Sequence, residues 1–90
     1  MAVAVMVDSP EGSQATYEEV RVRLGGRKPE GGIFHIAGPG PNGGWRVIEV
    51  WESVELADAF FREHLVPALH ATGAPPPERR ELWPVHAAMR

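Results

Sequence analysis

The 90-residue sequence predicts one α+β domain, in which a four-stranded antiparallel sheet carries two helices on one of its faces. Three observations lead to this prediction. Four short stretches have the apolar pattern of strands, two longer stretches have helical periodicity with capping signals, and a loop rich in glycine and proline separates the second and third strands. The resulting order, βαββαβ, is the ferredoxin-like arrangement. Residues 1–90 are treated as a single domain because a chain of this length forms one core.

The N-terminal third is predicted to contain a central strand and the first helix. Residues 2–7 (AVAVMV) are apolar on both faces of a strand, and the turn-forming residues 8–12 close it. Thr16 and Glu19 have the spacing of a capping box, which places the start of the helix at Thr16. Gly25 suits the left-handed position that ends many helices. The helix is expected to turn three side chains inward: Tyr17, Val20 and Leu24.

The next two strands are predicted to form a hairpin. Residues 32–37 (GIFHIA) and 45–51 (WRVIEVW) have strand composition, and they flank residues 38–44 (GPGPNGG). A segment with so many glycines and prolines does not form a helix or a strand. We therefore expect residues 38–44 to be the loop that connects two neighbouring antiparallel strands.

A second helix and a last strand complete the order. Ser53 can cap a helix that runs from residue 54 to about residue 72. Pro67 lies inside it and is expected either to kink the helix or to restart it in a new first turn. The last strand is predicted at residues 79–88, and Pro84 within it favours a position at the edge of the sheet.

Composition excludes several classes of function. The net charge is −3 without a cluster of Lys or Arg, which argues against nucleic acid as a partner. The chain has no cysteine, so disulfides and thiolate metal sites are excluded, and we expect a cytoplasmic protein. The apolar N-terminus is too short to span a membrane and lacks a basic start, so no membrane partner is expected. The four histidines lack the helical spacing of a metal site, so no bound metal is expected.

The hairpin determines which side chains share a face of the sheet. If the loop is centred near residue 41, Ile33 lies opposite Glu49 and His35 lies opposite Val47. One face then carries Ile33, His35, Ala37, Trp45, Val47, Glu49 and Trp51. The other face carries only apolar side chains: Phe34, Ile36, Ile48 and Val50. We expect this purely apolar face to lie beneath the helices.

The face with the tryptophans is therefore expected to be free of helices, and Ala4 and Met6 are expected to join it. An apolar patch of this kind is normally covered, and a second copy of the chain is the simplest cover. The predicted partner arrangement is a homodimer through the open sheet face. Two sheets packed face to face would enclose a space that is both apolar and polar, with His35 and Glu49 inside, which is typical of a small-molecule site.

Three segments carry a resemblance to a known family: GGIFHIAGP at 31–39, GGWRVIEVWES at 43–53 and LVPAL at 65–69. In a βαββαβ chain of this size, these segments resemble the dimeric α/β-barrel proteins, and among them the small proteins grouped with the antibiotic biosynthesis monooxygenases. The resemblance covers nearly the whole chain. It implies an enzyme that works without a bound cofactor on a hydrophobic, aromatic or polyketide-like small molecule.

The haem-degrading branch of the same superfamily fits the sequence less well. Its tryptophan on the third strand is matched by Trp51. The haem-ligating histidine of the second helix is replaced by Phe61, or by Phe60 if the alignment is shifted. The asparagine of the first strand is missing from residues 2–7.

His35 and Glu49 are the catalytic candidates. Either could remove a proton from a phenol or an enol, because both residue types act as general bases. The carbanion formed could reduce dioxygen in a dry pocket, and the same base could serve a cyclisation or an isomerisation. Six residues are expected to contact the substrate: Trp45, Trp51, Ile33, Val47, Met6 and His86.

Each candidate also has a purely structural interpretation. The tryptophans can pack in a dimer core, and His35 can be a hydrogen-bonded core histidine. Glu49 can form a salt bridge with Arg46, with Arg80 or with an arginine of a second subunit. Together these interpretations describe the alternative function, a non-catalytic module for ligand binding or dimerisation.

Overall fold

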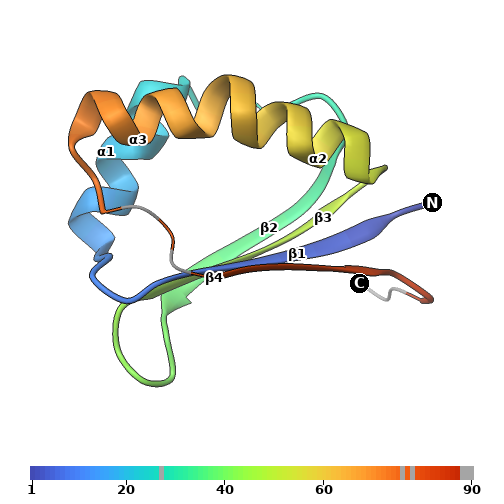
Figure 1. Ribbon diagram of the computed structural model, residues 1–90, viewed down its shortest axis with the longest axis horizontal. Coiled ribbons are helices and arrows are strands. Elements are labelled where there is room, and N and C mark those ends of the chain that lie inside the picture. Colours follow the sequence, from blue (N-terminus) through green and yellow to red (C-terminus); the bar gives the residue numbers. More distant parts are fainter. Residues whose placement is uncertain (27, 76, 78, 88–90) are drawn as a thin grey trace.

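The computed structural model describes residues 1–26, 28–75, 77 and 79–87, and it confirms the βαββαβ order (Figure 1). The four strands form one antiparallel sheet in the order β2-β3-β1-β4. The strand bounds are β1 (Val3–Ser9), β2 (Gly32–Pro39), β3 (Trp45–Trp51) and β4 (Arg79–Pro84). The helical segments are α1 (Gln14–Leu24), α2 (Val54–Phe60), η1 (Phe61–Leu65) and α3 (Val66–Thr72).

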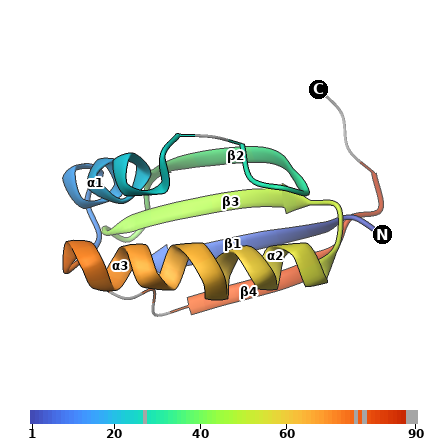
Figure 2. The same cartoon turned by 90° about the horizontal axis from the view of Figure 1, so that it is seen from above.

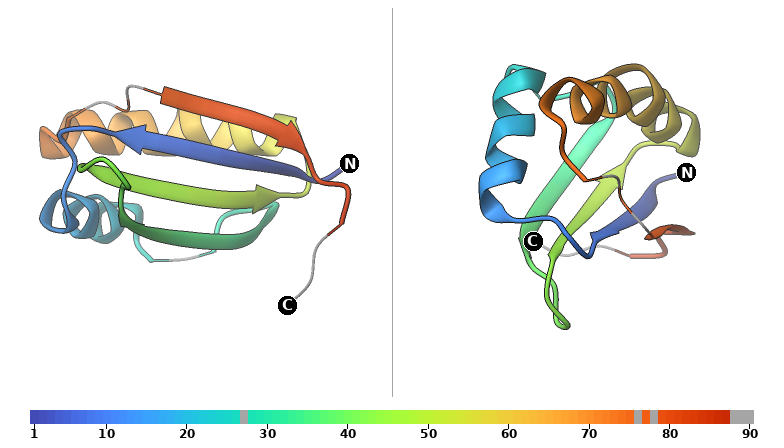
Figure 3. Two further views of the ribbon diagram at one scale, coloured as in Figure 1. Left: turned by 90° about the horizontal axis from the view of Figure 1, so that it is seen from below. Right: turned by 60° about the vertical axis from the view of Figure 1, so that its left-hand side comes forward.

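All of the helices lie on one face of the sheet (Figure 1). The segments α2, η1 and α3 follow one another in a single long helix, and α1 lies beside its C-terminal end (Figure 2). Viewed from below, the opposite face of the sheet carries no helix (Figure 3). Within the described part of the chain, none of the helices combines the length and apolarity that crossing a membrane requires.

Helix α1 is capped by Ser13 and not, as the sequence suggested, by Thr16. The Thr16 N–H donates to Ser13 Oγ at 3.2 Å, and the Ser13 N–H donates to Thr16 Oγ1 at 3.1 Å. The two side chains thus form a reciprocal capping box one turn earlier than predicted. The predicted end of the helix is confirmed, because Gly25 adopts a left-handed conformation with φ of 87°.

The second helix keeps its predicted start and end and accommodates Pro67 by a change of helical type. Ser53 accepts a hydrogen bond from the Leu56 N–H at 3.2 Å, as predicted. The segment η1 is a π-helix, and Pro67 follows it in the first turn of α3. Pro67 thus has the predicted first-turn position in α3, where a missing N–H is tolerated. The helix does not restart there, because Leu65 and Val66 keep helical backbone angles.

The hairpin register differs from the prediction by two residues. Strands β2 and β3 extend to a Pro39–Trp45 pair, so His35 lies opposite Glu49 instead of Val47. A shift of two residues leaves the division of side chains between the faces intact. Near the start of β2 a bulge leaves Ile33 without a strand partner.

The ends of the sheet agree with the sequence except in the length of β4. Strand β1 is central, and β4 pairs with it at the edge, as Pro84 indicated. The predicted strand 79–88 is too long, because β4 ends at Pro84 and residue 88 lies outside the described residues.

The prediction of which face lies beneath the helices is wrong. Trp51 is only 2% exposed and forms the buried core with Val5 of β1 and Ala57 of α2. Since Val5 lies opposite Glu49, and Glu49 opposite His35, this whole row faces the helices. We had assumed that the purely apolar face must be the core face. Instead, the polar groups lie under the helices and are paired with one another.

The helix-free face carries the aliphatic and aromatic side chains that the sequence had placed in the core. Phe34 and Ile36 of β2 are 55% and 48% exposed. The strand register adds Ile48, Val50, Ala4, Met6 and Trp83 to the same face. Met6 is thus correctly placed on the helix-free face but not together with His35, because it lies opposite Ile48.

Candidate active site between the sheet and the helices

A cavity of about 810 Å³ lies between the sheet and the helices. Its walls come from β2 and β3, from one side of α1, and from the long helix at Phe60, Leu65 and Leu69. The volume falls in the range of sites that hold small organic molecules. The lining mixes apolar side chains with polar ones, among them Tyr17, His35 and Glu49.

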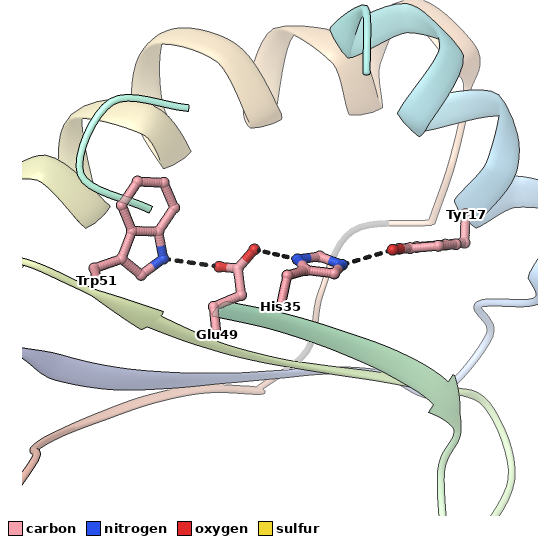
Figure 4. Close-up of polar contacts among 4 residues, drawn as sticks. All are labelled: Tyr17, His35, Glu49 and Trp51. Carbon is pink, nitrogen blue, oxygen red and sulfur yellow. Dashed lines mark hydrogen bonds and ion pairs between the residues drawn. The ribbon is translucent and has the colours of Figure 1, made fainter. Parts of the chain in front are cut away.

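Four side chains in this cavity form a continuous chain of hydrogen bonds (Figure 4). The Tyr17 hydroxyl lies 2.6 Å from His35 Nε2, and His35 Nδ1 lies 2.9 Å from Glu49 Oε2. At the other end, Trp51 Nε1–H donates to Glu49 Oε1 at 3.1 Å. The chain runs from α1 across β2 to the C-terminal end of β3.

Strand and helix geometry bring these residues together. His35 and Glu49 are direct cross-strand partners, and Trp51 is two residues further on the same face of β3. Tyr17 reaches down from the first turns of α1, and its ring stacks over His35 and Trp45 with centroids 6.0 and 5.4 Å away. Trp51 is fixed by the tilted Phe60 ring at 5.3 Å.

The partners of Glu49 define the chemical state of the histidine. An ionised carboxylate only accepts hydrogen bonds, so His35 carries a proton on Nδ1. In the neutral ring the Nε2 lone pair is then free to accept, and the Tyr17 hydroxyl donates to it. The His35 side chain is 45% exposed and that of Glu49 19%, so the imidazole is the more accessible of these two cavity-lining groups.

The arginine partners suggested for Glu49 belong to other carboxylates. Arg46 forms a bidentate pair with Asp8 at 2.7 and 2.9 Å, on the opposite face of the sheet. Asp8 holds the pKa of the Arg46 guanidinium above its ordinary value, chiefly through this hydrogen bond. Arg80 bonds Asp58 at 2.9 Å and lies over the Phe61 ring. Among the described side chains, Glu49 is therefore held by a histidine and an indole, and not by an arginine.

Tyr17 is kept in its protonated form. Burial raises the pKa of its phenol above the ordinary value; Arg21 acts in the opposite direction, and the negative charges of Glu18 and Glu49 raise it further. A phenol whose pKa is raised above its ordinary value keeps its proton near neutral pH, so Tyr17 can donate a hydrogen bond but does not act as a base there. In the pair with His35, the histidine is therefore the proton acceptor.

The structure gathers most of the predicted site residues at the cavity. His35, Glu49, Trp45, Trp51, Val47 and Ile33 all line it. Met6 does not, because it lies on the other face of the sheet. His86 does not either, because it follows β4 in an exposed bend. The position of the cavity also differs: it lies within one subunit, beneath its own helices, and not between two sheets.

The sequence interpretation missed the role of Tyr17, which it placed among the inward side chains of the first helix. The available signal was this inward position, since a buried tyrosine hydroxyl generally finds a partner. The place of Phe60 and Leu65 in a cavity wall could not be inferred while the wrong face of the sheet was assigned to the helices.

The described residues contain no group of three or more His, Asp or Glu side chains that could hold a metal ion. The donors at the cavity are instead an imidazole, a carboxylate and a phenol that are bonded to one another.

The fold is the ferredoxin-like fold of the antibiotic biosynthesis monooxygenase-like proteins, as solved structures show over nearly the full chain. SnoaB, a cofactor-independent oxygenase from Streptomyces nogalater, superposes with a TM-score of 0.62 at 20% identity, over 98% of this chain and 95% of its own. Rv0793 from Mycobacterium tuberculosis superposes with a TM-score of 0.66 at 17% identity, over 99% of this chain and 100% of its own.

A third structure is a provisionally assigned antibiotic biosynthesis monooxygenase from Chloroflexus aurantiacus. It superposes with a TM-score of 0.61 at 15% identity, over 98% of this chain and 95% of its own. No family sequence model matches the chain, and no curated protein sequence matches it. At these identities the likeness establishes the fold, and the site must be argued from its own residues.

The ionisation of Tyr17 can be measured directly because the chain has only one tyrosine. We expect the phenolate absorbance in an ultraviolet pH titration to have its midpoint above about 10, the ordinary value for tyrosine. Arg21→Gln should raise the midpoint further, because the opposing positive charge is removed. Arg23→Gln, on the exposed side of the same helix, should leave it unchanged.

The same shift predicts how stability depends on pH. Below pH of about 10 both the folded and the unfolded chain keep the phenol protonated. Above it the unfolded chain loses the proton first, so the free energy of unfolding should fall as pH rises toward the raised pKa of the folded state. In Tyr17→Phe, the part of the decrease in the free energy of unfolding that comes from this phenol should be absent. A wild-type midpoint at or below 10 would contradict the burial of this phenol.

Proposed function

We propose that this protein is an enzyme that removes a proton from a hydrophobic, aromatic small molecule, with His35 as the general base. The observation that carries the proposal is the Glu49–His35–Tyr17 chain of hydrogen bonds inside a cavity large enough for such a molecule. A carboxylate behind a histidine whose other nitrogen borders a cavity is the arrangement that general-base catalysis requires.

The proton transfer follows from the bonds already present. A phenolic, enolic or acidic C–H group of the substrate displaces the Tyr17 hydroxyl and meets His35 Nε2. The bond to the substrate proton breaks, an N–H bond forms at Nε2, and the electron pair stays on the substrate as a phenolate or carbanion. Glu49, bonded to Nδ1–H at 2.9 Å, stabilises the imidazolium that forms. Trp51 donates to Glu49 and keeps the carboxylate in place.

Tyr17 supplies the complementary role of a hydrogen-bond donor. Its pKa is raised by burial, so it remains a phenol while negative charge develops on the substrate. Once displaced from His35, this neutral donor can donate to the oxyanion that develops on the substrate and so stabilise it. The rings of Trp45 and Tyr17 offer flat surfaces on which an aromatic substrate can stack.

The fate of the carbanion decides the overall reaction, and we favour oxygenation by dioxygen. An electron-rich carbanion can transfer an electron to dioxygen; C–O bond formation and return of the proton then give a hydroperoxide, and loss of water leaves a ketone. This sequence needs dioxygen as the co-substrate and no bound cofactor. The structural likeness to the cofactor-independent oxygenase SnoaB supports it. The same base could also serve a cyclisation or an isomerisation.

Two features weigh against the alternative of a non-catalytic module. That alternative predicted an arginine partner for Glu49. Glu49 is instead bonded to a histidine, and a cavity of about 810 Å³ adjoins the pair. A purely structural histidine would not need its basic nitrogen at the surface of a cavity.

Proton removal can be tested with anthrone, an aromatic ketone with an acidic methylene group. In heavy water without oxygen, wild-type protein should accelerate deuterium exchange at the methylene, and with oxygen it should accelerate oxygen uptake. His35→Ala should lower both rates by about 10²–10⁴-fold, the usual contribution of a general base. Glu49→Gln should lower both rates less, because the base remains but its imidazolium is not stabilised.

His70→Ala is the matched control, since His70 is exposed on α3 and does not line the cavity. Its rates should equal those of the wild type. Full exchange and oxygen uptake in His35→Ala would refute His35 as the base. Normal exchange without oxygen uptake in the wild type would retain the base and favour an isomerase or a cyclase.

We also propose that the protein is a homodimer that pairs through the helix-free face of the sheet. The support is the apolar character of this face, on which Phe34, Ile36 and Trp83 are 55%, 48% and 44% exposed. A contiguous apolar surface of this kind on a small domain is normally covered. The homodimer leaves the cavity within each subunit, so each subunit has a complete site.

The dimer can be tested with two substitutions of equal chemistry. Ile36→Arg places a charge on the helix-free face and should convert the dimer to a monomer in native mass spectrometry. Val22→Arg changes an apolar residue of α1 that is 80% exposed but lies on the helical side, and the dimer should persist. A wild-type monomer, or a dimer that persists in Ile36→Arg, would overturn the proposal.

A further inference from the structure

We infer that one buried water molecule joins Arg80 to Glu49, and that Arg80 is thereby a positioning residue for the Glu49–His35 pair. The inference rests on the proposed function for the role of that pair, while the water site follows from groups that the proton transfer does not use. Two independent observations point to the site. They are a small cavity beside Glu49 and a buried N–H group of Arg80 that no described residue accepts.

The smaller cavity lies between the sheet and the long helix and shares Glu49 with the larger one. Its volume of about 10 Å³ is close to the least space that holds one water molecule, and it is too small for an organic ligand. Among the described residues that line it, only Glu49 and Arg80 carry a charge. The rest of its wall is Trp51 together with aliphatic and aromatic side chains of β1 and the long helix. A water molecule here therefore has two charged partners in an otherwise apolar wall.

The strand register brings Arg80 to the same face of the sheet as Glu49. Arg80 of β4 lies opposite Val7 of β1, and Glu49 of β3 lies opposite Val5. Val5 and Val7 are two residues apart, so both side chains point toward the helices. The long helix passes above β1 and β4 (Figure 2). Arg80 and Glu49 thus approach the smaller cavity from opposite sides of β1.

The other contacts of Arg80 hold its guanidinium group beneath the long helix. Nη2 donates to Asp58 Oδ1 at 2.9 Å, and the guanidinium carbon lies 4.4 Å from the centre of the Phe61 ring. The Nε atom is buried, and no described residue accepts its hydrogen. A buried N–H group in a folded protein is normally paired, with ordered water where no protein acceptor is in reach. The smaller cavity offers the place for that water.

Glu49 can accept the hydrogen bond that such a water donates. A carboxylate has about four acceptor positions. His35 bonds to Oε2 and Trp51 bonds to Oε1, so each oxygen keeps a further position. A water that accepts from Arg80 Nε–H and donates to Glu49 satisfies both groups, and such a bridge is nearly as favourable as a direct hydrogen bond.

The bridge gives Arg80 an indirect role in proton removal. It adds a third hydrogen bond to the Glu49 carboxylate, from the direction of β4, and so restricts how the carboxylate can turn. The carboxylate in turn orients His35 through the 2.9 Å bond to Nδ1. Arg80 does not line the larger cavity, so it acts on the reaction through Glu49 and not by contact with the substrate.

A high-resolution crystal structure of the wild type tests the water site without any need for turnover. Electron density for one water is expected at hydrogen-bond distance, about 3 Å, from both Arg80 Nε and a Glu49 oxygen. Arg80→Met should lack this water, because only one charged partner remains in the cavity wall. The wild-type density decides the water site even if Arg80→Met is unstable.

Deuterium exchange into anthrone tests the positioning role. Arg80→Met should lower the rate at saturating anthrone by about two- to tenfold, the effect of one lost hydrogen bond. The anthrone concentration that gives half of the maximal rate should stay unchanged, because Arg80 lies outside the larger cavity. Asp58→Asn is the matched control, since it removes the charge of the ion pair but keeps an oxygen that can accept from Nη2. It should retain both the water and the wild-type rate.

Three results would each overturn the inference. They are wild-type crystals without a water between Arg80 and Glu49, a wild-type rate in Arg80→Met, and a loss of rate in Asp58→Asn equal to that in Arg80→Met. The last of these would assign the effect to the Arg80–Asp58 ion pair. If the wild type does not accelerate exchange at all, the proposed function fails and the positioning role fails with it, whereas the water site still depends on the density alone.

Discussion

The hydrogen bond between His35 and Glu49 is the interaction on which the site depends. The two residues are direct cross-strand partners, so the register of the β2–β3 hairpin sets their contact at 2.9 Å. A slip of one residue would send them to opposite faces of the sheet. The same pair also solves an energetic problem, because a mostly buried carboxylate must have hydrogen-bond partners. His35 and Trp51 supply them, and His35 is thereby held in the form that can accept a proton.

The order of the elements could be predicted from sequence because its signals are local. Ser53 and Gly25 act within a few residues of the positions they determine, and both were interpreted correctly. The loop 38–44 was correctly predicted to join a hairpin, but the register inferred from its centre was wrong by two residues, because β2 extends to Pro39. The choice of the face beneath the helices is not local. Both faces of the hairpin are rich in apolar side chains, so periodicity alone does not distinguish them, and the rule that the more apolar face is the core fails when a cavity lies under the helices.

The candidate site could be predicted only in part for the same reason. His35 and Glu49 were recognised because a histidine and a carboxylate are unusual on an otherwise apolar strand surface. Tyr17 could not be joined to them, since its contact with His35 spans 18 positions of sequence and requires α1 to cover the hairpin. Arg46 and Arg80 seemed suitable partners for Glu49 by charge, yet each has a carboxylate of its own.

The central claim is that Glu49 fixes His35 with its proton on Nδ1 and leaves Nε2 as the basic nitrogen toward the cavity. The nitrogen chemical shifts of the His35 ring, measured by NMR at a pH where the ring is neutral, report this tautomer directly. We expect a protonated Nδ1 and an unprotonated Nε2 that accepts a hydrogen bond from Tyr17. A ring protonated on Nε2, with Nδ1 unprotonated beside Glu49, would contradict this assignment, because Nε2 would then have no lone pair to offer a substrate.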